Sequence, residues 1–395
     1  MTITIIITIC SLLLLAYVFE LTASKTRVPS VILLLLSGWL VRHFTDFLEI
    51  HIPDLSALLP AFGTIGLILI VLEGSLELEF HKSKFALIRK SFVGSLISML
   101  ALAFILTYFF NYFSGESLKV CLVNAIPLCV ISSAIAIPSV KALAKQTKEF
   151  VIYESSLSDI IGVLLFNFVA FNDSFGINSF GHFGLQLLIM TIVSFVATIG
   201  LSFLLSKINH HIKFAPIILL VILIYAISKV YHLPGLIFIL LFGLFIGNLD
   251  ELKQFKWIEK LNPESLNKEV SKFRELIIEG TFLIRAFFFL LFGFLMNTKE
   301  ILNTETLFWA LGIVATTFII RAIQLKVSRL SLSPLFFIAP RGLISILLFL
   351  SIEPSQNILL MNKSLIIQVI ILSALLLMLG LMRNNVSEKS NNNIL

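Results

Sequence analysis

Long apolar stretches alternate with short polar ones along almost the whole chain. Each stretch is long enough to cross the hydrocarbon core of a bilayer as a helix. The pattern therefore predicts an all-α polytopic membrane protein. Thirteen transmembrane helices are expected, at residues 2–22, 28–45, 57–77, 91–113, 118–144, 150–171, 183–206, 214–230, 233–249, 276–297, 306–325, 332–352 and 364–382.

The basic residues between these stretches predict how the chain crosses the membrane. With the N-terminus outside and the C-terminus in the cytoplasm, 21 of the 29 lysines and arginines fall in inward segments and four in outward ones. Such an imbalance is typical of cytoplasmic loops. One missed helix would scramble the alternation, so the charges support the span count. A location in the cell (inner) membrane is expected.

Composition excludes several classes of protein. With 58% hydrophobic residues, 13% charged residues and a mean hydropathy of +1.02, the chain is too apolar for an ordinary soluble domain. The net charge of +6 comes from residues scattered over many loops, so it does not indicate nucleic-acid binding. The three cysteines show no ligand spacing, and no cofactor is expected. The apolar run at residues 2–19 lacks the pattern of a cleavable signal and is interpreted as the first span.

A repeat narrows the architecture. Pro29 and Gly38 match Pro234 and Gly243 within similar apolar segments, both at an offset of 205. Two inverted six-helix repeats are therefore expected, the plan of many secondary transporters. The predicted parts are a first repeat at 1–172, a linker span at 173–212, a second repeat at 213–383 with an inward loop at 250–275, and a cytoplasmic tail at 384–395.

Two spans are predicted to be broken helices that cross each other. Pro138 interrupts the fifth span, and Pro340 and Gly342 flank Arg341 in the twelfth. Unwound backbone at membrane depth persists only where protein or water covers it. Both breaks therefore point to one buried site, although a simple proline kink is an equally good explanation for either helix alone.

Asp159 is the strongest candidate for a functional residue. A carboxylate deep in a spanning helix costs about 2.5–3.5 kcal/mol on insertion scales, so such residues usually face a bundle interior or a water-filled path. Ser155 lies four residues earlier on the same helix face, and Glu154 and Ser158 share the neighbouring face. Carboxylate and hydroxyl oxygens suit Na+, and the same carboxylate can hold a proton. A polar cluster that only fastens helices together is the alternative.

Other buried charges need partners. Glu73 in the third span is either a second acid lining the path or an interfacial residue. Arg321 and Arg341 cannot lose their protons, so each requires compensation. We expect Glu154 to pair with Arg341, which leaves Asp159 as the one acid free to titrate. Arg285 is paired with Glu279 or with another group.

At this point the sequence resembles the monovalent cation:proton antiporters, specifically the sodium/proton exchanger branch with thirteen spans. The resemblance covers roughly residues 5 to 380. It rests on ordered motifs at Val28–Gly38 (VPSVILLLLSG), Leu72–Leu78 (LEGSLEL), Glu154–Asp159 (ESSLSD), Phe289–Asn297 (FLLFGFLMN) and Pro340–Leu343 (PRGL). It implies that Asp159 binds the ion with Ser155 as a neighbouring ligand, that Glu154 and Arg341 form a scaffold, and that the protein is a homodimer.

Two departures from the family pattern affect the site. Ser158 stands where the family has asparagine before the aspartate. The family's Thr-Asp-Pro of the fifth span falls on Ile135, Ala136 and Ile137, so a second carboxylate is absent. Ser132, Ser133 and backbone carbonyls freed near Pro138 are candidates to replace it.

The expected function is exchange of Na+ for H+ across the lipid bilayer by alternating access. A proton and a cation compete for Asp159, and one titrating acid predicts electroneutral 1:1 exchange. The alternatives are exchange of K+ or Li+, and a channel-like or sensory protein that has lost exchange. A membrane enzyme is disfavoured because the spans contain no nucleophile constellation or metal-ligand spacing.

Overall fold

The structure is a computed structural model. It describes residues 2–392 except 27, 50, 51, 53, 79–81, 142, 173–175, 208–212, 232 and 250–262. Every regular element in this part of the chain is a helix, which confirms the predicted all-α class. The part of the predicted inward loop at 250–262 lies outside the described residues.

The helices follow the predicted apolar stretches. The long ones are α1 (Thr2–Thr26), α2 (Ser30–Phe47), α3 (Leu58–Glu77), α4 (Phe85–Ser114), α7 (Lys145–Phe171), α8 (Ile177–Lys207), α9 (Phe214–Val230), α10 (Leu236–Gly247), α13 (Pro263–Phe294), α15 (Thr304–Val327) and α17 (Lys363–Asn392). The short ones are η1 (Lys82–Lys84), α5 (Leu118–Ala125), η2 (Ile126–Leu128), α6 (Ser133–Ser139), α14 (Thr298–Ile301), η3 (Leu335–Phe337), α16 (Leu343–Leu350) and η4 (Pro354–Gln356).

Length and hydropathy agree with a membrane location. Within the described residues, eight helical segments are long and apolar enough to span a bilayer, and three shorter apolar helices accompany them. Helix α7, which carries Asp159, is not among these eight segments. The count of thirteen spans stays a prediction.

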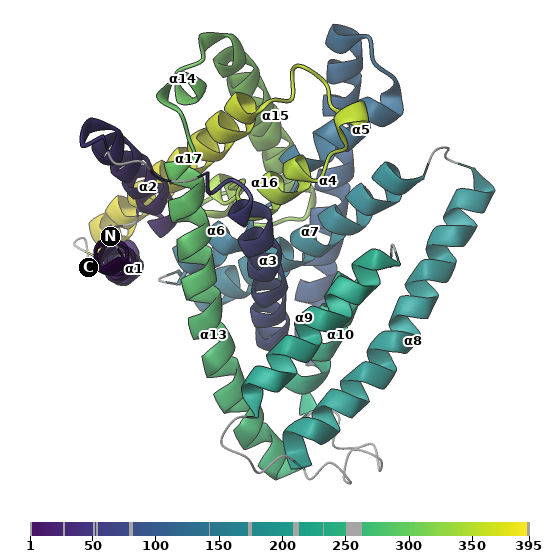
Figure 1. Ribbon diagram of the computed structural model, residues 1–395. Helices are drawn as coiled ribbons and strands as arrows, with labels where there is room; N and C mark the ends of the chain where they lie inside the picture. The colour runs from purple at the N-terminus through teal and green to yellow at the C-terminus, as the bar shows by residue number, and fades with distance from the viewer. Residues whose placement is uncertain are drawn as a thin grey trace. The chain divides into compact units, whose positions relative to one another are not determined.

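The chain divides into two compact units. The first unit contains residues 1–63, 90–166 and 283–395, and the second contains 64–89 and 167–282. In the second unit, α8, α9 and α10 pack side by side (Figure 1). There α10 also approaches α3 closely, since a Cβ on Gly243 would overlap the side chain of Ser75. Small residues such as glycine and serine allow the backbones of membrane helices to approach this closely.

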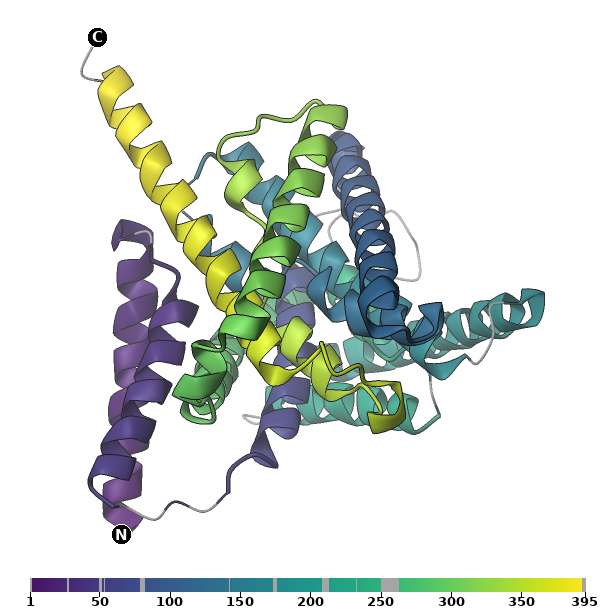
Figure 2. The ribbon, with the colours of Figure 1, turned by 90° about the horizontal axis from the view of Figure 1, so that it is seen from above.

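The first unit holds the candidate site. Helices α1 and α2 form an antiparallel pair, and α15 packs against α17 (Figure 2). Helix α2 also lies against α13 through two glycines: a Cβ on Gly38 would overlap the carbonyl of Leu290, and a Cβ on Gly293 would overlap that of Leu35. Gly38 and Gly243, the matched glycines of the sequence repeat, are thus both at close helix contacts.

The fifth span is broken, but not at the predicted residue. Helix α5 continues into η2, the chain is non-helical at residues 130–132, and α6 begins at Ser133. Pro138 lies inside α6, which continues to Ser139. The prediction that Pro138 makes the break is therefore wrong. Pro138 cannot donate a backbone hydrogen bond, but α6 continues past it to Ser139.

The twelfth span is broken where expected. Residues 338–342 separate η3 from α16, and this non-helical segment contains Pro340, Arg341 and Gly342. The two breaks meet, because the Ser132 amide donates a 2.9 Å hydrogen bond to the Pro340 carbonyl. This contact satisfies buried polar backbone groups that neither helix can satisfy by itself.

Candidate functional site

Asp159 lies on α7 with its side chain directed at the start of α6. The residue is 1% exposed. Its Oδ2 accepts hydrogen bonds from the Ser133 hydroxyl and, at 3.3 Å, from the Ser133 amide. Its Oδ1 is buried and has no hydrogen-bond partner. A buried carboxylate oxygen without a partner is costly, so this atom is a natural position for a proton or a cation.

Ser158 fixes the unwound backbone beside Asp159. Its hydroxyl accepts a 2.9 Å hydrogen bond from the Ile131 amide, in the middle of the break. Two adjacent residues of α7 therefore contact the interruption. Ser158 bonds to the unwound segment at Ile131, and Asp159 bonds to Ser133, the first residue of α6. This explains how a polar residue before the aspartate contributes to the site without contacting the carboxylate.

Ser132 and Gly342 bring the two breaks into close contact. A Cβ on Gly342 would lie 2.6 Å from the Ser132 hydroxyl oxygen and 2.9 Å from Cδ1 of Ile135. Only glycine fits without displacing one of the segments. The Ser132 hydroxyl is buried and has no hydrogen-bond partner, so the interrupted region contains a second unsatisfied oxygen besides Asp159 Oδ1.

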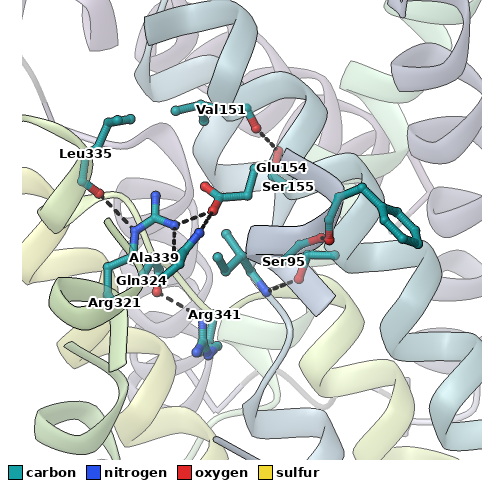
Figure 3. A network of polar contacts seen from close by, with 12 residues as sticks. Ser95, Val151, Glu154, Ser155, Arg321, Gln324, Leu335, Ala339 and Arg341 are labelled. Atoms are coloured by element: carbon teal, nitrogen blue, oxygen red, sulfur yellow. Dashed lines mark hydrogen bonds and ion pairs between the residues drawn. The ribbon is translucent and has the colours of Figure 1, made fainter. Parts of the chain in front are cut away.

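Glu154 forms a buried polar cluster with α15 (Figure 3). Its Oε1 accepts hydrogen bonds from Arg321 Nη1 at 2.5 Å and from Gln324 Nε2 at 2.6 Å. Arg321 Nη1 also donates to Gln324 Oε1 at 2.9 Å, and Arg321 Nε to the Leu335 carbonyl at 3.1 Å. The expected pair between Glu154 and Arg341 is therefore wrong. Arg321 on α15 is the arginine that pairs with Glu154.

Arg341 instead binds carbonyl oxygens at the two breaks. Its Nε donates to the Leu128 carbonyl at 2.6 Å, and its Nη1 donates to that of Ala339 at 3.1 Å. Leu128 is the last residue of η2, where helical carbonyls have no partner within the helix. A cation is favoured at such an end. Arg341 therefore joins one break to the other without a carboxylate partner among the described residues.

The remaining expected site residues are placed as follows. The Ser155 hydroxyl is buried and donates to the Val151 carbonyl of its own helix at 2.7 Å. Glu73 lies on α3 in the second unit, whereas Asp159 belongs to the first. Arg285 Nη2 lies 3.6 Å from Glu20 Oε1, so its ion-pair partner is Glu20 on α1 and not Glu279.

Gln324 and Ser373 are site residues that sequence reasoning missed. Gln324 completes the Glu154 cluster, and the Ser373 hydroxyl accepts a 3.0 Å hydrogen bond from the Arg341 amide. Gln324 carried a usable signal, because it is a polar residue three positions after Arg321 on one helix face of an apolar span. Ser373 carried none, since a lone serine in a spanning helix usually bonds its own backbone.

The chemistry available at the site is that of one carboxylate among hydroxyls and freed backbone groups. Among the described residues, no three histidines, cysteines or acids lie together in a way that could hold a tightly bound metal ion. Oxygen ligands with a single negative charge match a weakly held monovalent cation, or the proton that replaces it.

Comparison with known proteins agrees with this chemistry. A family model described as "Sodium/hydrogen exchanger, transmembrane" matches residues 9–383. Among solved structures, the sodium proton antiporter MjNhaP1 from Methanocaldococcus jannaschii at pH 8 has a TM-score of 0.63 and 18% identity, with 96% of each chain covered.

An electron-microscopy structure of the same antiporter has a TM-score of 0.63 and 19% identity, covering 99% of this chain and 97% of that one. At this identity the likeness shows the fold alone. No curated protein matches the chain. The family model, however, spans nearly the whole sequence, and on that ground the chain belongs to the sodium/hydrogen exchanger family of membrane transporters, which are not enzymes.

Proposed function

We propose that the protein exchanges Na+ for H+ across the membrane by alternating access, with both ions competing for Asp159. The observation that carries the proposal is the buried carboxylate beside two interrupted helices, with Oδ1 unpartnered and Oδ2 held by Ser133. The structural neighbours, described as sodium proton antiporters, support Na+ as the cation.

The ligands available to a cation here come from three places. Asp159 supplies the charge, and Ser132 and Ser133 at the break supply hydroxyls. Ser155 and Ser158 on α7 supply two more, although each hydroxyl already makes one hydrogen bond to backbone. The Ser155 hydroxyl donates to a carbonyl and so keeps both lone pairs for a cation, whereas the Ser158 hydroxyl accepts from an amide and keeps one. We propose this set in place of the second carboxylate that is missing at Ala136.

Obligatory exchange follows from the free-energy cost of moving an ionised Asp159 that holds neither a proton nor a cation. When Asp159 is empty and ionised, moving it through a closed low-dielectric barrier costs several kcal/mol, roughly the desolvation penalty of one ion. A proton or a monovalent cation removes that cost, so only the occupied site crosses readily. One charge exchanged for one charge makes the cycle electroneutral.

The two buried arginines have partners of their own and do not compete with the exchanged ions for Asp159. Arg321 is neutralised by Glu154, and Arg341 is bound by carbonyls. Neither occupies Asp159, which leaves its carboxylate as the group that changes occupant. We also propose that the chain consists of two inverted repeats, residues 1–172 and 213–383 with a linker span at 173–212, so that each compact unit contains segments of both repeats. Two close contacts support it, because they correspond to each other under the repeat: α2 lies against α13 and α10 lies against α3, and at the offset of 205 α2 matches α10 while α3 matches α13.

A proton-flux assay in proteoliposomes tests the proposal. With wild-type protein, a Na+ gradient is expected to drive a pH change whose rate does not depend on an imposed membrane potential. Asp159→Asn is expected to abolish it, because an amide takes up neither ion. Exchange that persists in this variant would refute the role of Asp159.

The same assay separates the alternatives. Replacing Na+ by K+ or Li+ identifies the transported cation. A cation current without proton movement would favour a channel-like relative, for which the absence of an acid at Ile135, Ala136 and Ile137 is the motivating feature. We further propose a homodimer in the cell membrane, with the N-terminus outside and the C-terminus in the cytoplasm.

A further inference from the structure

A second polar cluster in the first unit takes no part in the account so far. Its centre is Glu20 on α1, which is buried except for 15% of its side chain. Glu20 Oε1 accepts a 3.0 Å hydrogen bond from Lys141 Nζ and lies 3.6 Å from Arg285 Nη2. Glu20 Oε2 accepts a 2.9 Å hydrogen bond from Ser30 at the start of α2. One carboxylate therefore joins four segments of the chain.

Lys141 connects this cluster to the candidate ion site. It follows Ser139, the last residue of α6, by two positions, and α6 begins at Ser133, whose hydroxyl and amide hold Asp159. A seven-residue helix is about 10 Å long, so α6 is a short rigid element between the two groups. Helix α6 packs against α1. Movement at one end of α6 therefore has to appear at the other.

A small pocket lies along the same helix. Residues of α6, among them Ala134 and Pro138, line one part of it, and Ala23 and Pro29 from the α1–α2 pair line another. Ser30 belongs both to the pocket lining and to the Glu20 cluster. The ion pairs therefore lie at the edge of the space between α6 and the α1–α2 pair.

We propose that Glu20 is a latch residue, whose ion pairs with Lys141 and Arg285 hold the end of α6 against α1 and α13. These ion pairs open when Asp159 becomes accessible along the face of α6 that lines the pocket. The inference rests on the proposed function, because alternating access requires α6 to move relative to its neighbours. The pairs are suited to reversible opening, since Lys141 is 54% exposed and water can solvate it once it is released.

A reversible cross-link tests the latch. In a Cys10→Ser background, Glu20→Cys and Lys141→Cys are joined by a short bis-methanethiosulfonate reagent, and the link is checked by mass spectrometry. Cation-driven proton flux is expected to fall at least tenfold on linking and to return when a reductant cleaves the link. Full transport by the linked protein would overturn the proposal. The matched control links Arg42→Cys to Asp46→Cys, which form an ion pair within α2 alone, and should leave the flux unchanged.

A labelling experiment measures the opposite change. Ser139→Cys in the same background reports access to the end of α6 in nanodiscs, where a maleimide reaches both faces. Glu20→Gln is expected to raise its labelling rate by roughly fivefold or more, the size of a typical coupling between sites, while Asp46→Asn leaves it unchanged. An equal rate in Glu20→Gln and wild type would contradict the latch. Failure of the proposed function is distinguishable, because unlinked protein would then show no cation-driven flux at all.

Discussion

Asp159 has two carboxylate oxygens in different surroundings. Oδ2 is held by Ser133, whereas Oδ1 has no partner. The Ser133 contacts orient the carboxylate so that Oδ1 is left for the exchanged ion. The Ser133 hydroxyl is the closer of the two donors, and a hydrogen bond to a charged group contributes about 1.5–3 kcal/mol.

Ser133→Ala tests this orientation. Loss of the hydroxyl is expected to raise the cation concentration needed for half-maximal exchange by roughly tenfold or more. This factor corresponds to the energy of the lost hydrogen bond to the carboxylate. The control is Ser139→Ala, because Ser139 lies on the same helix and its hydroxyl bonds, among the residues that the structure describes, to the Ile135 carbonyl alone. If both variants shift the half-maximal concentration equally, the Ser133 hydroxyl has no special role.

Glu154 is a different kind of acid, because it neutralises Arg321 inside the protein. Glu154→Gln leaves the Arg321 guanidinium buried without a counter-charge, which typically destabilises a protein by about 3–5 kcal/mol. A lower unfolding temperature is therefore expected in detergent. The double variant Glu154→Gln with Arg321→Gln should recover part of the loss, since it removes both charges. Equal or greater loss in the double variant would show that the pair does not act as a unit.

The interrupted helices are the elements that make the site, and Gly342 sets how closely they approach. Gly342→Ala places a Cβ against Ser132 and Ile135, so the Ser132–Pro340 hydrogen bond should be lost and exchange should slow by tenfold or more. Gly312→Ala on α15 is the control, because no described atom outside the adjoining turns of α15 lies within 4 Å of its Cβ position. A Gly342→Ala variant with wild-type rates would show that close contact of the breaks is unnecessary.

At this scale, sequence reasoning located the second break and misplaced the first. Pro340 and Gly342 lie in a truly unwound segment, whereas the fifth span unwinds at residues 130–132, which contain neither proline nor glycine. Contacts made far along the chain produce that break. Ile131 donates to Ser158, Ser132 donates to Pro340, and Arg341 binds the carbonyl of Leu128. No local pattern encodes such tertiary partners.

Across the whole molecule, hydropathy predicted the helices well and the charge partners poorly. Apolar length is a property of each segment, so α1 to α17 fall close to the predicted spans. Ion pairs depend on which helices lie together. For this reason the sequence predicts a pair between Glu154 and Arg341, whereas Glu154 in fact bonds to Arg321. The sequence likewise gives no sign that Glu20 is the partner of Arg285. Asp159 was identifiable because a buried carboxylate in a span is informative wherever its neighbours lie.

Orientation in the membrane is a prediction that belongs to the whole chain. The distribution of lysine and arginine predicts that the C-terminus lies in the cytoplasm. A fluorescent protein fused after Leu395 should therefore be fluorescent, and alkaline phosphatase fused at the same place should be inactive. The reverse pair of results would invert the predicted orientation.

Proton release on cation binding tests the central claim most directly. When NaCl is added to purified protein in weak buffer, on the acid side of the titration of Asp159, about one proton should be released per Na+ bound. The apparent dissociation constant should also rise roughly tenfold for each unit that the pH falls there, because one proton competes with one cation. Asp159→Asn should bind no Na+ and release no proton. Wild-type protein that binds Na+ without releasing a proton, or Asp159→Asn that still releases one, would contradict the account.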